Sequence, residues 1–140
     1  MNQFDRILVE SLKQINLSGG DVLHALKKTD KSYQGFGEVY FSKIKFKAVK
    51  AWKFHEKMSL NLIVPIGNVR FVFFNEHDKN FREITIGESN YKRIFVPPKI
   101  WFGFMGLGEN VNLVVNTANI EHDPEEVRKK HVDEFEYTWL

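Results

Sequence analysis

The stretch EVYFSKIKFKAVKAWKF, residues 38–54, constrains the fold more than any other part of the sequence, because its side chains alternate in type. One parity carries mainly apolar residues, and the other, followed to residue 55, carries basic ones: Tyr40, Ile44, Phe46, Ala48, Trp52 and Phe54 against Lys43, Lys45, Lys47, Lys53 and His55. A period of two residues is typical of a strand that buries one face. The pattern predicts β structure, interrupted by a turn near Lys47.

Five further runs have the composition of strands: LNLIVPI (60–66), NVRFVFFN (68–75), FREITIG (81–87), YKRIFVPP (91–98) and NLVVNTA (112–118). Turn-forming segments such as EHDKN, GESN and GLGEN separate several of them. These connections are too short to hold the helix that joins parallel strands. We therefore predict a mainly β fold, an antiparallel jelly-roll barrel with short N-terminal helices.

The two ends of the chain differ from this middle part. Residues 4–17 place apolar side chains near one helical face and predict a helix, which SGGD (18–21) ends. Residues 21–28 predict another helical turn, and so do residues 124–131, after which Tyr137 and Trp139 are expected to dock on the body. We expect one domain, with a helical lead-in over 1–36, a barrel over 37–120 and a tail over 121–140.

Composition excludes several classes of function. The 140 residues contain no cysteine, which rules out disulfides, thiolate zinc sites and cysteine nucleophiles. The N-terminus lacks the apolar core of a signal peptide, and the sequence has no run of about 18 apolar residues that would span a membrane. We therefore expect a cytoplasmic protein that does not bind membranes.

The lysines at 43, 45, 47, 50 and 53 form a basic stripe, although the net charge is only +2. Such a stripe is compatible with binding of an anionic polymer such as DNA. It is more typical of a solvated strand edge, where lysines prevent edge-to-edge pairing. We expect no nucleic-acid partner.

Among the five histidines, His55 is the one on a strand with other chemistry-bearing residues. A jelly-roll metal site typically uses two histidines two positions apart on a strand, but here Lys53 and Lys57 flank His55 at that spacing. A protonated lysine has no lone pair for a metal. We expect no metal site and no other cofactor.

Lys53 and His55 share one face of the predicted strand and form a candidate proton-transfer pair. If that face lines the barrel interior, desolvation and mutual repulsion would lower the pKa values of both groups. The alternative is that Lys53 belongs to the basic stripe and His55 bonds to a loop.

Several segments occur in a recognisable order: FGEVYFSKI, VKAWKFHEKMSLNLIVPIGNVRFVFFN, YKRIFVPPKIWFGFMGLG, and HDPEEV followed by EYTW. From Gly37 to Trp139 the chain resembles the dTDP-4-dehydrorhamnose 3,5-epimerase-like branch of the cupin superfamily. Members of that branch handle nucleotide-linked keto sugars. The resemblance implies a cupin barrel, a nucleotide-linked sugar as ligand and a homodimer.

The resemblance also places the family's functional positions on this chain. Lys50 stands where the family has an arginine, and Lys53 stands where it has the histidine that acts as general base. Phe102 replaces the histidine of the second motif, and Val115 falls at the position of the tyrosine acid. The nearest histidine to the base position is His55.

These positions lead to named roles. We expect His55 to act as base, Lys53 to stabilise an enolate and Lys50 to lie near the diphosphate. Trp101 and Phe104 are candidates for apolar walls against the ligand, with core packing as the alternative. Asn112 and Asn116, at even positions of one strand, are candidates for hydrogen bonds to sugar hydroxyls.

Two functions follow from the resemblance. The first is a nucleotide-sugar epimerase or isomerase, which removes a proton next to the ketone of a dTDP-linked 4-keto-6-deoxy sugar in surface-polysaccharide biosynthesis. The second is a catalytically degenerate cupin that binds a nucleotide sugar without 3,5-epimerase activity. The substituted base and acid positions suit the second reading, and His55 beside Lys53 suits the first.

Overall fold

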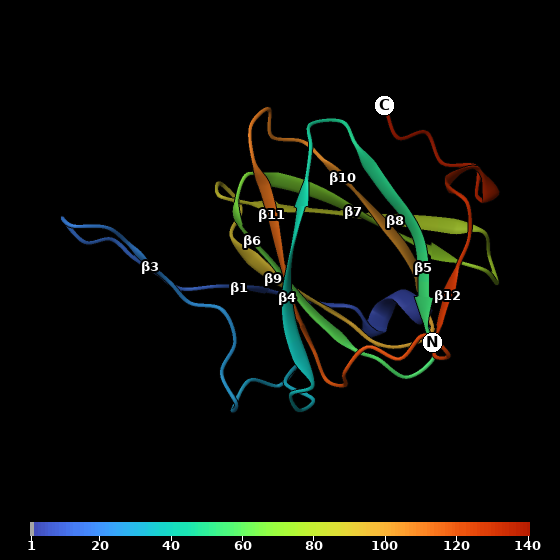
Figure 1. The fold of residues 1–140 in the computed structure, drawn as a ribbon, viewed down its shortest axis with the longest axis horizontal. Helices are drawn as coiled ribbons and strands as arrows, with labels where there is room; N and C mark the ends of the chain where they lie inside the picture. Colours follow the sequence, from blue (N-terminus) through green and yellow to red (C-terminus); the bar gives the residue numbers. More distant parts are fainter. Residues whose placement is uncertain (1) are drawn as a thin grey trace.

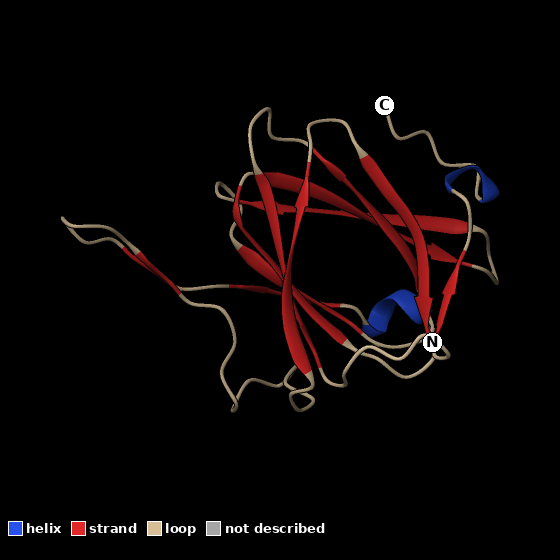
Figure 2. Ribbon diagram, viewed as in Figure 1, coloured by secondary structure: helices blue, strands red, loops and turns tan. Residues whose placement is uncertain are grey.

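The computed structural model describes residues 2–140. Its strands are β1 (Leu8–Ser11), β2 (Gln14–Ile15), β3 (Val22–Leu23), β4 (Glu38–Ile44), β5 (Val49–His55), β6 (Leu60–Ile66), β7 (Asn68–Asn75), β8 (Asn80–Gly87), β9 (Lys92–Val96), β10 (Trp101–Gly106), β11 (Asn112–Ala118) and β12 (Val127–Lys129). Two short 3-10 turns, η1 (Gln3–Arg6) and η2 (Val132–Glu134), complete the elements. The mainly β fold is confirmed (Figure 2).

Two five-stranded antiparallel sheets form the barrel. The first has the order β1-β9-β6-β11-β4 and the second the order β12-β5-β10-β7-β8. Figure 1 shows the two sheets facing one another, with β4 and β5 passing from the first sheet to the second. This arrangement is the jelly roll that the strand spacing predicts. The predicted turn near Lys47 is confirmed, since Lys47 has φ of 63° between β4 and β5.

The main apolar core lies between the two sheets. Alternate residues of β6 and β7 point into it, among them Leu62, Val64, Phe71 and Phe73, all of which are buried. This alternation follows from the period of two along a strand, which sends neighbouring side chains to opposite faces. The core borders a cavity between the sheets, since Leu62, Phe102 and Val114 belong to both.

A bulge in β5 decides which of its side chains point inward. Two successive residues of β10 pair with Lys53 and Ala51, which leaves Trp52 without a partner in β10. Gly103 of β10 is needed at this crossing, because a Cβ there would lie 2.5 Å from the Cβ of Ala51. An extra residue shifts the alternation by one position. As a result Lys50 and Lys53, three residues apart, line the same cavity.

The C-terminal tail covers the outer face of the second sheet. Trp52 is 1% exposed and packs there against the rings of Phe135 and Trp139, at centroid distances of 5.2 Å and 5.3 Å. Tyr137 donates a hydrogen bond to Glu83 of β8, at 2.7 Å. The predicted docking of Tyr137 and Trp139 is confirmed. The predicted helical turn over 124–131 is wrong, because residues 127–129 form β12 and pair with β5.

The predicted N-terminal helices are also wrong. Within residues 2–36 only η1 is helical, and Leu8–Ser11 forms β1, which pairs with the edge of β9. Residues 14–15 and 22–23 form a narrow hairpin that projects from the body (Figure 1). The apolar spacing of residues 4–17 fits a helix, but pairing with β9 completes the hydrogen bonds of an open sheet edge, which outweighs local propensity.

Candidate active site

A cavity of about 390 Å³ opens between the two sheets. Its walls come from β4, β5, β6, β10, β11 and β12: Tyr40, Ser42, Lys50, Ala51, Trp52, Lys53, His55, Leu62, Phe102, Phe104, Val114, Asn116, Lys129 and Lys130. The volume is within the range of small-molecule sites, roughly 300–1,000 Å³. Polar groups from facing sheets therefore converge on one enclosed space.

His55 forms a buried pair with Glu126. The imidazole Nδ1 lies 2.6 Å from Glu126 Oε2, and both side chains are less than 10% exposed. A carboxylate at Nδ1 holds the proton on that nitrogen and leaves the lone pair of a neutral imidazole on Nε2. The ring stacks on Phe102, with 6.4 Å between centroids, which fixes its plane. The pair has the composition of an oriented general base.

Glu126 is itself held in place by the backbone. Its Oε1 accepts hydrogen bonds from the N–H groups of Lys57 and Met58, at 3.0 Å and 2.9 Å. Burial alone would raise the pKa of Glu126, but the hydrogen bonds from His55, Met58 and Lys57 outweigh burial and hold that pKa below its ordinary value. Glu126 is therefore a carboxylate at neutral pH.

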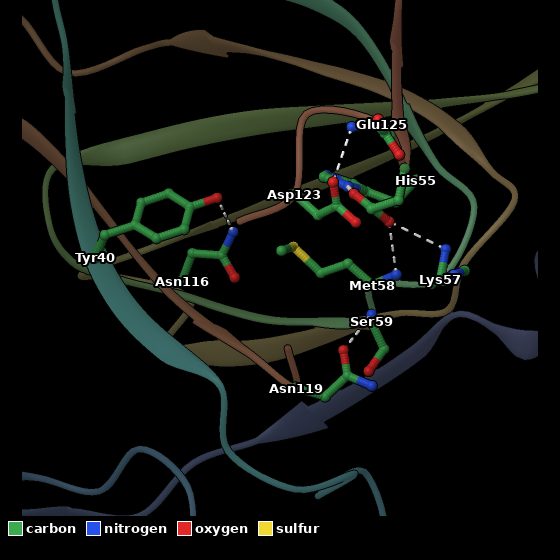
Figure 3. A network of polar contacts seen from close by, with 10 residues as sticks. Tyr40, His55, Lys57, Met58, Ser59, Asn116, Asn119, Asp123 and Glu125 are labelled. Atoms are coloured by element: carbon green, nitrogen blue, oxygen red, sulfur yellow. Dashed lines mark hydrogen bonds and ion pairs between the residues drawn. The ribbon is translucent and has the colours of Figure 1, made fainter. Parts of the chain in front are cut away.

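Tyr40 and Asn116 form a second polar pair on the opposite sheet. The Asn116 Nδ2 group donates a hydrogen bond to the Tyr40 hydroxyl oxygen at 2.8 Å, which leaves the phenolic O–H free to donate. Figure 3 shows this pair on one side of the view and His55 on the other. Burial raises the pKa of Tyr40, opposed by the Asn116 hydrogen bond and reinforced by Glu38 and Glu126. Tyr40 therefore keeps its proton at neutral pH.

Lys53 and Lys129 face one another across β5 and β12. The two residues are direct partners in the antiparallel register, and both line the cavity. Burial lowers the pKa of the Lys53 amine, and the positive charges of Lys129 and Lys50 lower it further. Like charges directly opposite on a sheet repel one another. This wall of the cavity therefore favours either a bound anion or a Lys53 side chain in its neutral amine form.

Most of the residues predicted for the site meet at the cavity. Lys50, Lys53, His55, Phe104 and Asn116 all line it. The Oδ1 atom of Asn116 is buried and has no hydrogen-bond partner among residues 2–140. A ligand hydroxyl that donates to this oxygen would satisfy it.

Trp101 and Asn112 do not line the cavity. Trp101 is three residues from Phe104 on β10, so the strand sends the two rings to opposite faces, and Trp101 packs against Phe54 outside the barrel. Asn112 is fully buried, and its amide bonds the backbone of Asn68, Gly108 and Ile44. Asn112 therefore holds loops together at one end of the barrel.

Sequence reasoning missed Glu126 and Tyr40. Glu126 lies 71 residues from His55 in the chain, and nothing in its local pattern marks it. Tyr40 falls on the apolar parity of its strand, and its place beside Asn116 depends on the pairing of β4 with β11. HDPEEV, within the segments that carry the family resemblance, contains Glu126 and was the available signal.

A second hollow of about 320 Å³ shares Tyr40, Lys53, His55 and Lys129 with the cavity. Its other walls are Glu38, Met58, His122 and Val127. The groups that carry chemistry thus lie between two openings. Among residues 2–140, no three His, Asp or Glu side chains are grouped to hold a metal ion. No helix in the same range is long and apolar enough to cross a membrane.

A jelly-roll barrel around a polar internal cavity is the architecture of the cupin superfamily. The crystal structure of a dTDP sugar isomerase from Desulfovibrio desulfuricans G20 matches this fold with a TM-score of 0.91 and 31% sequence identity, over 96% of this chain and 91% of that one. The chain belongs to the dTDP-4-dehydrorhamnose 3,5-epimerase-like family of cupins. No family model matches the sequence.

More distant solved structures share the fold, and one curated protein is related in sequence. The dTDP-6-deoxy-D-glucose-3,5-epimerase of Legionella pneumophila Philadelphia 1, in complex with dTDP-4-keto-L-rhamnose, has a TM-score of 0.78 at 14% identity, over 95% of this chain and 77% of that one. The sugar 3,4-ketoisomerase QdtA of Thermoanaerobacterium thermosaccharolyticum, in complex with TDP, has a TM-score of 0.75 at 16% identity, over 92% and 93%. The spore coat polysaccharide biosynthesis protein SpsL of Bacillus subtilis (strain 168) is 22% identical over 91% of this chain and 88% of that protein.

Proposed function

We propose that the protein is an epimerase or isomerase of a dTDP-linked 4-keto-6-deoxy sugar. The observation that carries this proposal is the pair His55–Glu126 on one sheet and the pair Tyr40–Asn116 on the facing sheet, around one cavity. A proton acceptor and a proton donor on opposite walls are what stereochemical inversion of a C–H centre requires. The names of the related proteins support a nucleotide-linked sugar as substrate.

His55 removes the proton from a carbon next to the ketone. The C–H electron pair moves into the carbon skeleton and gives an enolate, while Nε2 takes the proton and Glu126 stabilises the imidazolium. Lys53 stabilises the charge that develops on the ketone oxygen. The His55–Glu126 pair thus takes the role of the family's histidine base, whose position Lys53 occupies in this chain.

Tyr40 returns a proton from the opposite wall. Its O–H is free because Asn116 donates to the oxygen, and its raised pKa keeps it protonated until the enolate forms. Protonation from the face opposite His55 inverts the carbon, which favours epimerisation. The phenolate recovers its proton through solvent at either opening of the site.

The rest of the cavity suits the nucleotide and the sugar. Lys50 and Lys129 supply positive charge for the diphosphate. A lysine ammonium acts as a point charge and does not form the paired hydrogen bonds that an arginine guanidinium makes to phosphate. The rings of Phe102 and Phe104 offer an apolar wall. The unpartnered Oδ1 of Asn116 accepts from a sugar hydroxyl.

A place in surface-polysaccharide biosynthesis is part of this proposal. The role printed in the name of SpsL, spore coat polysaccharide biosynthesis, supports it. We propose the cytoplasm as the location, which suits a chain without cysteine. Fractionation of cells that express the protein tests that location.

Solvent exchange tests the reaction. The protein is incubated with dTDP-4-keto-6-deoxyglucose in deuterated water, and deuterium at C3 and C5 is followed by NMR. The expected result is incorporation next to the ketone, with inversion at one or both carbons. Binding of the nucleotide sugar without incorporation would favour the degenerate reading, and absence of binding would contradict both.

We also propose that the protein is a homodimer. The outer face of the first sheet exposes Val39 and Phe41 of β4, with relative exposures of 49% and 67%, beside the half-buried Val115 of β11. The projecting hairpin carries further exposed apolar residues, Leu17 and Val22. An isolated hairpin is marginally stable in water, so contact with a second copy would explain both surfaces. Sedimentation velocity tests this, and a monomer at micromolar concentration would contradict it.

A further inference from the structure

The Lys53 amine lies on the cavity wall without an anionic partner. Among residues 2–140 the ion pairs of the structure involve other groups, and Lys53 forms none of them. Glu126 is within the same region, but both of its oxygens are already engaged by His55 and the backbone. Glu38 lines the second hollow together with Lys53, but among residues 2–140 the two form no ion pair.

The cationic neighbours of Lys53 make its charged form less favourable. Lys129 is its direct partner across the strands, and Lys50 lies on the same cavity wall. Burial and these two charges lower the pKa of Lys53. A lysine that is desolvated or placed next to other cations is the form of lysine that attacks carbonyl groups.

We propose that Lys53 forms a covalent iminium with the ketone of the bound sugar. This inference rests on the proposed function, because it needs a keto sugar in the cavity. The charge-stabilising role of Lys53 has two chemical forms, an ammonium beside the ketone oxygen or an iminium in which nitrogen replaces that oxygen. The surroundings of Lys53 favour the second form.

Formation and hydrolysis of the iminium need no reactant other than the sugar, the Lys53 amine and water. The amine lone pair bonds to the ketone carbon while the carbonyl π pair moves to oxygen, and a proton then passes from the nitrogen to that oxygen to give a neutral carbinolamine. The nitrogen lone pair then forms the C=N bond as the hydroxyl takes a second proton and leaves as water. Loss of the adjacent C–H proton to His55 gives an enamine, and reprotonation followed by hydrolysis releases the product and the amine.

The positions of the other groups suit these steps. Lys53 and His55 are two residues apart on the same face of β5, so their Cα atoms are separated by roughly 7 Å. The long lysine side chain can reach the ketone carbon while the imidazole reaches the neighbouring carbon. Tyr40 on the facing sheet is a proton donor for the leaving hydroxyl.

Reductive trapping tests the proposal. The wild-type protein is mixed with dTDP-4-keto-6-deoxyglucose and cyanoborohydride, digested and analysed by mass spectrometry. The expected result is a reduced sugar-nucleotide adduct on the peptide that contains Lys53, suppressed by excess dTDP. Adducts spread over surface lysines and insensitive to dTDP would contradict it.

Two variants separate a covalent role from a charge role. Lys53→Arg keeps the positive charge but cannot form an iminium, so we expect it to lose both the adduct and the deuterium exchange while its thermal unfolding is unchanged. Lys45→Arg, at an exposed position directly after β4 and outside both hollows, serves as the control and should retain both. Exchange without an adduct in the wild type, or exchange retained by Lys53→Arg, would overturn the iminium and leave the proposed function intact. Failure of the wild type to bind the nucleotide sugar would instead overturn the proposed function.

Discussion

The chemistry of His55 depends on the atom that faces its Nδ1. A carboxylate at Glu126 accepts the Nδ1 proton, whereas an amide in its place would donate to Nδ1 and move the ring proton to Nε2. Glu126→Gln should therefore lose about 10²-fold or more in deuterium exchange while it remains folded. The measurement is the exchange rate by NMR. Glu125→Gln, an exposed neighbour, is the control, and equal rates in the two variants would contradict the role of Glu126.

Tyr40→Phe separates the removal of the proton from its return. His55 remains in this variant, so exchange with solvent at the carbon next to the ketone should continue. Inversion of that carbon should fall by about 10²–10⁴-fold, because the donor on the opposite wall is lost. Chiral analysis of the product beside the deuterium count makes the comparison. Tyr33→Phe, outside the cavity, should behave as the wild type, and loss of exchange together with inversion would argue against a donor role.

Glu126 also links stability to pH. Its pKa in the fold lies below the ordinary 4.5, so it stabilises the protein above that pH, and this contribution is lost as pH falls from 4.5 through the lowered folded value. The wild type should be more stable than Glu126→Gln at pH 7, and the difference should narrow below about pH 4.5. Urea unfolding at several pH values measures it. A difference that stays constant with pH would show that ionisation of Glu126 is not responsible.

Residue patterns predicted part of the site. The two-residue spacing correctly placed Lys53 and His55 on one face, because alternation is a local property of a strand. The same rule separates Trp101 from Phe104, which sit at odd spacing on β10. Glu126 lay beyond such reasoning, since its approach to His55 depends on the path of the tail.

At the scale of elements, the strands that bury one face were predictable. β6, β7 and β11 occupy the ranges that their composition indicates, 60–66, 68–75 and 112–118. β1 was not predictable, because the apolar spacing of its residues fits a helix and only pairing with the edge of β9 makes it a strand. β10 was missed because Gly103 and the prolines before the strand weaken its β propensity.

The C-terminal tail contributes to the stability of the fold and also carries Glu126 of the site. Phe135 stacks on Phe74, with 4.0 Å between the ring centroids, and contacts Trp52. The preceding strand β12 pairs with β5. Phe135→Ala should lower the free energy of unfolding by about 2 kcal/mol, less than for a fully buried ring because Phe135 is half-buried. It should also slow exchange by loosening the segment that carries Glu126.

Thermal unfolding and the exchange assay together test the tail variant. Glu136→Ala, at the exposed neighbouring position, is the control and should change neither quantity. Unaltered exchange in a clearly destabilised Phe135→Ala protein would show that the tail supports the fold without positioning Glu126.

At the scale of the whole molecule, the exposed outer face of β4 is the main feature without a partner. Phe41→Asp places a charge in the middle of the proposed interface and should convert a dimer to a monomer. Sedimentation velocity measures the change. Leu140→Asp, exposed at 79% on the C-terminal residue, is the control and should leave the dimer intact. A dimer that persists in Phe41→Asp would place the interface elsewhere.

Trp52 bonds the backbone of Lys130 but has no partner in β10, and this bulge has a consequence for how the chain tolerates changes in length. Deletion of one residue between Lys50 and Lys53 would restore regular pairing with β10 and would turn one of the two lysines away from the cavity. Related sequences that keep the same inward groups must therefore keep the same number of residues in this strand, while the loops between strands are free to lengthen. Comparisons between family members are best aligned by counting outward from this bulge.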